Sequence, residues 1–327
     1  MTKIKPWHEQ VGSQRDWVWR GWQTRYTYIR ASQLNAKTTP VLLLHGFGAS
    51  IGHWRQNMVS LSQNHNVYAL DMLGFGASRK AQVNYKIDLW VEQVYDFWRT
   101  FIQQPIVLIG NSIGSLVCLA AAAAHPEMVK SVVMIGLPDM SAREEAIPKF
   151  MRPAVAAIEG LFASPLLLKN VFYLVRRPGV VRKWAAIAYS NPAAISDELV
   201  DILTGPAQDR GAAAAFGAIL KAMIGSDFAP SVKTLLPNLE IPLLLIWGNQ
   251  DRMIPQSLSR RFVELNANLQ LVNVDNAGHC VHDECPEQVN QILLDWLDVK
   301  YMESSKPTLL AKSNIVRAYE EIPLNPP

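Results

Sequence analysis

The stretch that decides the fold is "VLIGNSIGSL", residues 107–116. It carries Gly110, Ser112 and Gly114 in the pattern G-x-S-x-G, directly after an apolar run typical of a buried strand and directly before a run of strong helix formers. A serine on so tight a strand-to-helix turn presents its hydroxyl to solvent, and side chains two residues to either side would collide with the turn's neighbours. The pattern therefore predicts that Ser112 is a nucleophile. The competing interpretation is a plain tight turn with an incidental serine.

Outward from this turn, strand-like and helix-like segments alternate. Amphipathic or Ala-rich helices are expected at 86–103, at 113–127 and from about residue 286, because apolar side chains there recur at three- and four-residue spacings or strong helix formers dominate. This alternation predicts an α/β fold in which a mostly parallel central sheet has helices on both faces. The segments predicted to be strands are "RYTYIRAS" (25–32), "PVLLLHGF" (40–47), "NVYALDM" (66–72), "PIVLIGNS" (105–112), "VKSVVMIGLP" (129–138), "IPLLLIWGNQD" (241–251) and "LQLVNVDNAGH" (269–279).

The pattern changes between the fourth buried strand and residue 236. Residues 140–235 are rich in Ala, Leu, Phe and Met, contain no clear strand and are expected to form a helical cap inserted into the core. The core would then comprise residues 25–139 and 236–298. Residues 1–24, which are rich in Trp, are expected to be an irregular N-terminal segment, and residues 299–327 a loosely packed C-terminal extension with four prolines.

A nucleophilic serine needs a base and an acid that orients the base. His279 ends the last predicted strand and is the candidate base. Asp251 follows the preceding strand in a loop before a new helix, and it is the candidate acid. Asp139, which follows the fourth buried strand at the start of the cap, is the second choice for the acid.

Two backbone amides are expected to form an oxyanion hole. One belongs to Ile113, the residue after the predicted nucleophile, and the other to Phe47, in the loop that follows the first buried strand. His45 ends that strand, and we expect it to brace this loop rather than to act as a base.

The stretch "NAGHCVHDECPE", 276–287, resembles a metal site in composition, but no metal is expected. Its Cys and His spacing fits no common zinc pattern, and no distant second pair of ligands exists. Asp283 and Glu284 are instead expected to stabilise the N-terminus of the following helix.

No cofactor is expected either. "GFGAS" occurs at 46–50 and again at 74–78, but the third glycine of a dinucleotide fingerprint is replaced by Ile51 in one copy and by Arg79 in the other.

Composition excludes some partners. The 327 residues are 49% hydrophobic and carry a net charge of only +3 without a dense basic block, so nucleic acid is not an expected partner. Residues 1–10, "MTKIKPWHEQ", lack the apolar run of a signal peptide, and no apolar run is long enough for a transmembrane helix, so neither is expected. Three scattered cysteines do not make a disulfide framework. We expect a cytoplasmic location, with peripheral membrane contact left open, and composition does not indicate the oligomeric state.

These motifs together resemble the α/β-hydrolase superfamily, in the branch with a helical cap after the sixth strand. The resemblance covers residues 25–298 and is carried by "LLLHGFGAS", "ALDMLGFGAS", "GNSIGS", "GNQDRMIP" and "AGHCVHDECPEQVN". It implies the chain order of the triad, Ser112, Asp251 and His279. The last motif is similar to that of pheophytinase-like hydrolases of plants and cyanobacteria, which implies a lipophilic, phytyl-type ester as substrate. Ser115 departs from many relatives, which have glycine there.

Three functions remain open at this point. The leading one is a serine esterase whose small-molecule substrate is a hydrophobic ester, covered by apolar cap segments such as "NVFYLV" and "GAAAAFGAIL". The second is a carbon–carbon bond hydrolase of dienone acids, for which Arg210 or Arg252 would have to bind the substrate carboxylate. The third is a receptor-like protein that keeps the triad and turns over slowly.

Overall fold

The computed structural model describes residues 6–32, 39–140 and 164–298. Its strands form one eight-stranded sheet in the order β1-β2-β4-β3-β5-β6-β7-β8. β1 pairs antiparallel with β2 and β2 antiparallel with β4, while the remaining pairs are parallel. Each segment predicted to be a strand overlaps one of these strands. The strands are β1 (Ser13–Trp19), β2 (Trp22–Ile29), β3 (Val41–Leu44), β4 (Val67–Leu70), β5 (Ile106–Asn111), β6 (Val129–Ile135), β7 (Leu243–Gly248) and β8 (Leu269–Val274).

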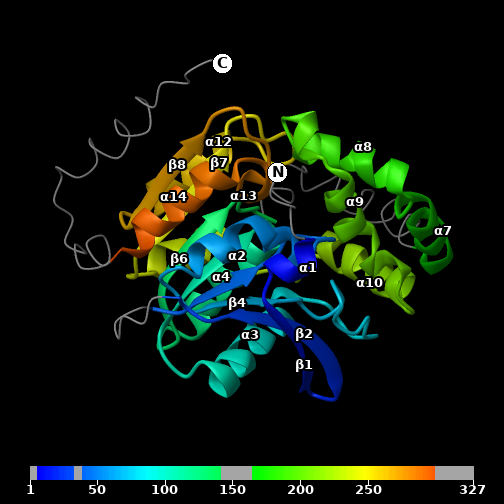
Figure 1. The fold of residues 1–327 in the computed structure, drawn as a ribbon, viewed down its shortest axis with the longest axis horizontal. Helices are drawn as coiled ribbons and strands as arrows, with labels where there is room; N and C mark the ends of the chain where they lie inside the picture. The colour runs from blue at the N-terminus through cyan, green and yellow to red at the C-terminus, as the bar shows by residue number, and fades with distance from the viewer. Residues whose placement is uncertain (1–5, 33–38, 141–163, 299–327) are drawn as a thin grey trace.

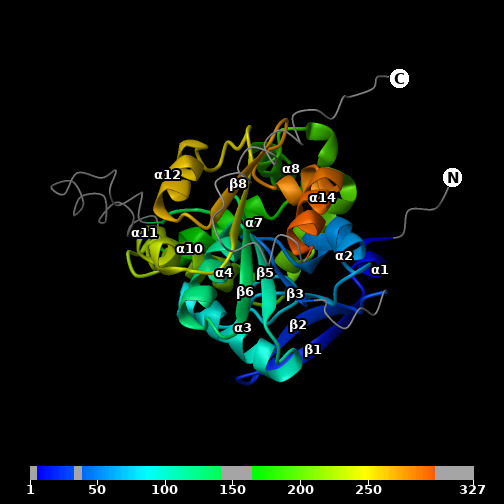
Figure 2. The same cartoon turned by 90° about the vertical axis from the view of Figure 1, so that its left-hand side faces the viewer.

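Helices cover both faces of this sheet, as the alternating pattern predicted. Figure 2 shows α3, α4 and α12 on one side of the sheet and α2 and α14 on the other. The core helices are α1 (Trp7–Gln10), α2 (Arg55–Leu61), α3 (Ile87–Phe101), α4 (Ile113–Ala124), α12 (Ser257–Leu265), α13 (Val281–Glu284) and α14 (Pro286–Leu297), with short 3-10 helices η1 (Ile51–Trp54) and η4 (Leu236–Asn238).

The central strands separate two hydrophobic cores. Successive side chains of a strand point to opposite faces, so Leu42 and Leu44 of β3 pack with α3 and α4, whereas Val41 and Leu43 pack with α2 and α14. Burial on both faces explains why these strands are continuous apolar runs.

The N-terminal segment differs from the expectation. Within residues 1–24 the described part forms α1 and then β1, which pairs with β2 through a tight turn at Arg20 and Gly21. Both turn residues have positive φ, 51° and 84°, as a two-residue hairpin requires. β1 is an edge strand in which only Trp19 is buried. Its sequence therefore lacks the apolar pattern of the central strands.

The described part of the insertion after β6 consists of helices and connecting loops. Its helices are α7 (Pro165–Val175), α8 (Pro178–Ala188), α9 (Asp197–Thr204), α10 (Ala212–Ile224) and α11 (Val232–Leu235), with η2 (Pro192–Ala194) and η3 (Pro206–Gln208). Figure 1 shows α7, α8, α9 and α10 gathered to the right of the sheet. The first part of the predicted cap, 141–163, and the predicted C-terminal extension lie outside the described residues. No helix in the described ranges is long and apolar enough to span a membrane.

Candidate active site

The turn at Ser112 has the geometry that the sequence predicted. Ser112 lies between β5 and α4 with φ 54° and ψ −120°, a backbone conformation that L-residues rarely adopt. A Cβ at Gly110 would lie 2.3 Å from the carbonyl carbon of Gly114, and a Cβ at Gly114 would lie 2.3 Å from the carbonyl oxygen of Leu44. Both glycines are therefore required by close backbone approach, and the strained turn leaves Ser112 partly exposed.

His279 and Asp251 meet at the ends of neighbouring strands. Nδ1 of His279 is 2.8 Å from Oδ2 of Asp251, and both side chains are almost fully buried. The other carboxylate oxygen of Asp251 accepts hydrogen bonds from the amides of Met253 and Ile254 at 2.8 and 2.9 Å. A carboxylate can only accept, so we assign the imidazole proton to Nδ1, which leaves the lone pair on Nε2. Nε2 is buried and makes no hydrogen bond with any described residue.

The end of β6 brings Ser112 and His279 to the same place. The amide of Ser112 donates to the carbonyl of Ile135 at 2.8 Å. The next residue, Gly136, has φ +60°, and a Cβ there would lie 2.9 Å from Nδ1 and Cε1 of His279. From β5, the side chain of Asn111 donates to the carbonyl oxygen of His279 at 3.3 Å. The serine turn and the imidazole thus lie against adjacent residues of one strand end.

The predicted oxyanion amides lie on either side of Ser112. Ile113 directly follows it, and the loop with Phe47 passes so close that a Cβ at Gly46 would be 3.4 Å from Cβ of Ser112. Neither the Phe47 nor the Ile113 amide donates a hydrogen bond to another described residue. Both donors are therefore available to a ligand.

His45 braces this loop, as predicted. Its Nδ1 lies 2.8 Å from the carbonyl oxygen of Gly46, and its Nε2 accepts a hydrogen bond from the Met72 amide at 3.2 Å. Burial lowers the pKa of His45 to about 4. The neutral ring therefore connects the ends of β3 and β4.

Asp139, the second-choice acid, lies after β6 on a small pocket of about 310 Å³ that Lys233 and Arg261 also line. The carboxylate bonded to His279 Nδ1 is that of Asp251.

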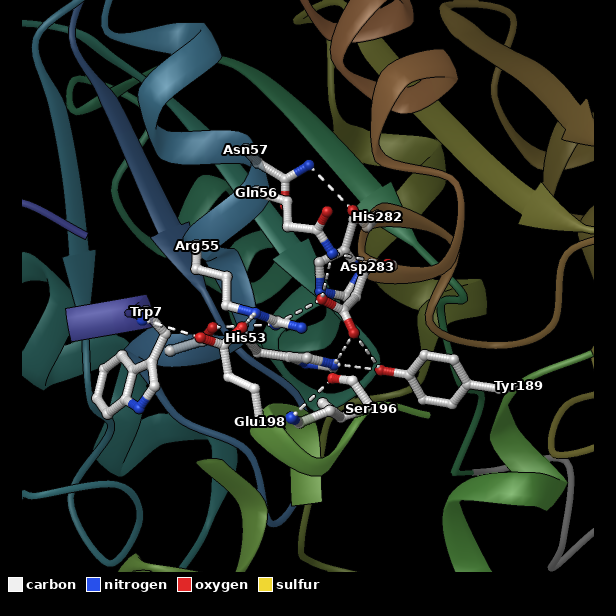
Figure 3. A network of polar contacts seen from close by, with 12 residues as sticks. Trp7, His53, Arg55, Gln56, Asn57, Tyr189, Ser196, Glu198, His282 and Asp283 are labelled. Carbon is white, nitrogen blue, oxygen red and sulfur yellow. Dashed lines mark hydrogen bonds and ion pairs between the residues drawn. The ribbon is translucent and has the colours of Figure 1, made fainter. Parts of the chain in front are cut away.

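Sequence reasoning missed a buried polar network (Figure 3) beside the loop of residues 275–280, which carries His279 and which we call the histidine loop. Asp283 was expected to serve the N-terminus of a helix. Its carboxylate instead accepts hydrogen bonds from Nη1 of Arg55 at 2.6 Å and from the hydroxyl of Tyr189 at 2.7 Å. Nε2 of His53 lies 2.8 Å from the same hydroxyl, and Arg55 also bonds Glu198 of α9 at 3.0 Å. These partners lie far apart in the chain, so no local pattern signals them.

The network sits where the end of α8 meets the histidine loop. The amide of His279 donates to the carbonyl of Ala188 at 2.6 Å. Glu284, also expected at a helix N-terminus, accepts from the amide of Asn191 at 2.5 Å and from that of Gly278 at 2.7 Å. We call this contact between residues 188–191 and 278–284 the seam.

Among the described residues no group of three His, Cys, Asp or Glu side chains is arranged to hold a metal ion.

Aromatic side chains link the loop that contains Phe47, the predicted oxyanion loop, to α7 and α10. The centroid of the Phe47 ring lies 6.0 Å from that of Phe216 in α10. The Phe216 centroid lies 5.1 Å from that of Phe172 in α7. A cavity of about 750 Å³ lies between α7 and α10, and its lining includes Arg210 but none of the residues predicted to be catalytic. The exposed Arg252 approaches the carbonyl of Ala186 at 3.5 Å.

The sequence of this chain matches a known family and resembles curated proteins of that fold. The profile of a family described as "alpha/beta hydrolase fold" matches residues 39–286. The chain is 26% identical over 317 residues to the chloroplastic pheophytinase of Arabidopsis thaliana, covering 86% of this chain and 65% of pheophytinase. It is 25% identical over 284 residues to the 2-hydroxy-6-oxo-6-(2'-aminophenyl)hexa-2,4-dienoic acid hydrolase of Metapseudomonas resinovorans, covering 85% and 88% of the two chains. The chain thus spans just under two thirds of the length of pheophytinase.

Solved structures show the same architecture. A membrane phospholipase A superposes with a TM-score of 0.70 and 26% identity, covering 89% of this chain and 88% of that one. A serine hydrolase involved in carbazole degradation superposes with a TM-score of 0.71 over 88% of this chain and 99% of that one. At 21% identity the second likeness concerns the fold alone.

Proposed function

The chain belongs to the α/β-hydrolase family, and from that premise we propose that it is a serine hydrolase that cleaves a lipophilic carboxylic ester. One observation carries the proposal. The His279 imidazole has its Nδ1 bonded to a fixed carboxylate and keeps a free Nε2. It packs against Gly136, next to the Ile135 carbonyl that accepts from the amide of Ser112 on its strained turn.

In the proposed reaction, Ser112 Oγ forms a bond to the carbonyl carbon while its proton passes to Nε2 of His279. The tetrahedral intermediate then breaks its bond to the leaving alcohol, which takes that proton, and an acyl-enzyme remains. A water molecule repeats the sequence, giving its proton to Nε2, and collapse of the second intermediate releases the acid and restores Ser112. Asp251 stabilises the imidazolium in each half-reaction.

The amides of Phe47 and Ile113 are proposed to bind the oxyanion of both intermediates. Their freedom from other described partners supports this role, because each can donate without breaking an existing bond. Removal of one such donor typically costs about 3 kcal/mol of transition-state stabilisation.

The nature of the covering helices supports a lipophilic substrate. We propose that residues 140–235 form a cap over a core of 25–139 and 236–298. The Phe47, Phe172 and Phe216 rings connect the cap to the oxyanion loop with an apolar surface, which favours a long or bulky hydrocarbon group. The likeness to pheophytinase points in the same direction.

A chain-length series tests the proposal. We expect kcat/KM for p-nitrophenyl esters to rise about three- to fourfold for each CH₂ that the site buries, until the pocket is full. Pheophytin should be assayed beside the series. Preference for the acetate ester would contradict the proposal of a lipophilic substrate. Failure to hydrolyse any ester would contradict the proposal that the protein is an esterase.

Carbon–carbon bond hydrolysis is the second candidate, because the dienoic acid hydrolase relative aligns over 88% of its own length. Arg210 lines the cap cavity and Arg252 is exposed. If this candidate is correct, a dienone acid will be turned over and Arg210→Ala or Arg252→Ala will raise its KM.

A burst of one equivalent of product followed by negligible turnover would instead favour a receptor-like protein.

A further inference from the structure

The outer helices of the cap carry an unusual surface. α7 and α8 are joined by a short turn and lie at the outer edge of the molecule, away from the sheet (Figure 1). Large apolar side chains on these two helices are exposed instead of packed. They are Trp184 (60% exposed), Leu174 (52%), Tyr173 (43%), Ile187 (41%), Leu167 (39%) and Val171 (37%).

These side chains recur at helical spacing. Leu167, Val171 and Leu174 are separated by four and three residues and so share one face of α7. Trp184 and Ile187, three residues apart, share one face of α8. Each helix therefore presents an apolar stripe outward, in addition to its inward contacts through Phe172 and Ala185.

The same segment concentrates the positive charge of the protein. Residues 164–190 contain five Lys and Arg and no Asp or Glu, whereas the other 300 residues hold 26 Lys and Arg against 28 Asp and Glu. The segment is thus +5 and the remainder −2. Arg182 pairs with Asp197, but Lys169, Arg177 and Lys183 form no ion pair with another described residue.

We propose that this surface of α7 and α8, which we call the cap face, docks on an anionic phospholipid bilayer. Exposed Trp and Leu side chains between cations suit the boundary of a bilayer, where apolar groups insert and Lys and Arg reach lipid phosphates. A protein partner fits less well, because the cores of protein interfaces are depleted in Lys.

Docking in this orientation has a consequence for the proposed esterase. The C-terminal end of α8 is the part of the cap that contacts the loop of His279. A bilayer held against α8 would therefore lie near the seam, and a lipophilic ester could pass from lipid to the site without crossing water. This delivery role rests on the proposed function, whereas the docking itself does not.

Vesicle sedimentation tests the docking. The full chain should bind vesicles of equal parts phosphatidylcholine and phosphatidylglycerol, bind pure phosphatidylcholine at least tenfold more weakly, and be released by high salt. Leu174→Ser with Trp184→Ser should lower binding tenfold or more, and so should Arg177→Glu with Lys183→Glu.

Matched controls lie elsewhere on the surface. Val18→Ser with Val59→Ser removes two apolar side chains that are 69% and 51% exposed, and Arg260→Glu with Arg261→Glu reverses two cations of α12. Both controls should bind the mixed vesicles like the wild type. All four variants should melt like the wild type and hydrolyse a soluble short-chain ester at its rate.

Three results would overturn the docking. They are no binding to the mixed vesicles, equal binding of cap-face and control variants, and loss of a wild-type dimer in the Leu174→Ser, Trp184→Ser variant, which would assign the face to a second copy of the chain. Vesicle binding without hydrolysis of any ester would leave the docking intact and overturn only the proposed function.

Discussion

The ends of the central strands and the helices of the proposed cap meet at the candidate site, but the two regions differ in how densely they are packed. Every residue of β5 and β7 is buried, and so are ten of the twelve residues of α4. In α8, by contrast, only Ala185 is buried. The groups proposed to act on the ester bond belong to the first region, whereas the groups proposed to select the substrate belong to the second.

This difference separates two tasks. Chemistry requires atoms held to within a fraction of an ångström, which dense packing of strands and close glycine contacts provide. Substrate selection and access require a surface that can move or vary. The seam joins the two regions by hydrogen bonds. The His279 amide donates to the carbonyl of Ala188, the Tyr189 hydroxyl donates to Asp283, and the Asn191 amide donates to Glu284.

The largest expected effect is in the core. Ser112→Ala and His279→Ala should each lower kcat by about 10⁴-fold or more, and the double variant should be hardly worse, because the two residues act as a unit. Circular dichroism should show unchanged melting for Ser112→Ala. Retention of wild-type turnover by purified Ser112→Ala would place the chemistry elsewhere.

The next effect separates the two candidate acids. Asp251→Asn should lower kcat by about 10⁴-fold, because an amide no longer favours the productive imidazole tautomer. Asp139→Asn should change kcat less than about twofold, since Asp139 lies outside the proposed triad. Steady-state kinetics on one ester decides between them, and the reverse ranking would move the acid to the start of the cap.

Acid should destabilise the folded protein through its buried histidines. Burial lowers the pKa of His53 and His45 to about 4 and that of His282 well below its ordinary value. Between about pH 4 and 6.5 the unfolded chain therefore binds more protons than the folded one, so stability is present above 6.5 and lost as the pH falls. Burial raises the pKa of Asp71 to about 6, which opposes this trend, but it is one group against three.

Scanning calorimetry checks the sign. We expect the Tm at about pH 5 to lie about 5 °C or more below its value at about pH 7. A Tm that rises on acidification would mean that Asp71 outweighs the buried imidazoles.

Ser115 tests how the core holds the serine turn. Its buried hydroxyl donates to the carbonyl of Gly110 at 2.7 Å and accepts from the amide of Ile135 at 2.9 Å. Ser115→Ala leaves that amide without this partner and should lower the free energy of unfolding by about 2 kcal/mol in urea titrations. Ser257→Ala, at an exposed position, is the control and should change it by less than about 0.5 kcal/mol. Equal values for the two variants would contradict the bridging role.

The seam gives the smallest effect. Tyr189→Phe removes the hydroxyl between His53 and the buried carboxylate of Asp283, and it should cost about 1.5–2 kcal/mol of stability. Lys86→Ala removes an exposed ion pair with Asp227 and should leave the urea midpoint unchanged. A larger shift for Lys86→Ala would mean that surface contacts, not the buried network, hold the cap.

The sequence predicted what depends on local pattern. Apolar runs, G-x-S-x-G, and an Asp and a His at strand ends sufficed to predict the central strands and the contact between Asp251 and His279, because parallel strands bring their carboxyl ends to one edge. It also predicted the bracing role of His45.

What it missed depends on distant pairing. β1 was missed because an edge strand with one buried side chain has no apolar signature. The roles of Asp283 and Glu284 were mistaken for helix stabilisation. Arg55 and Tyr189 are 228 and 94 residues from Asp283, and only the folded chain brings them together. The exposed stripes of α7 and α8 have the same spacing as a buried helix face, so periodicity could not show which face was outside.

Covalent labelling by a fluorophosphonate, read by mass spectrometry, tests whether Ser112 is an activated nucleophile, because the reagent reacts with a serine only when a base activates it. We predict one adduct per chain, located on Ser112, absent from Ser112→Ala and formed far more slowly by His279→Ala. No adduct on the folded wild-type protein, or an adduct on another residue, would contradict this prediction.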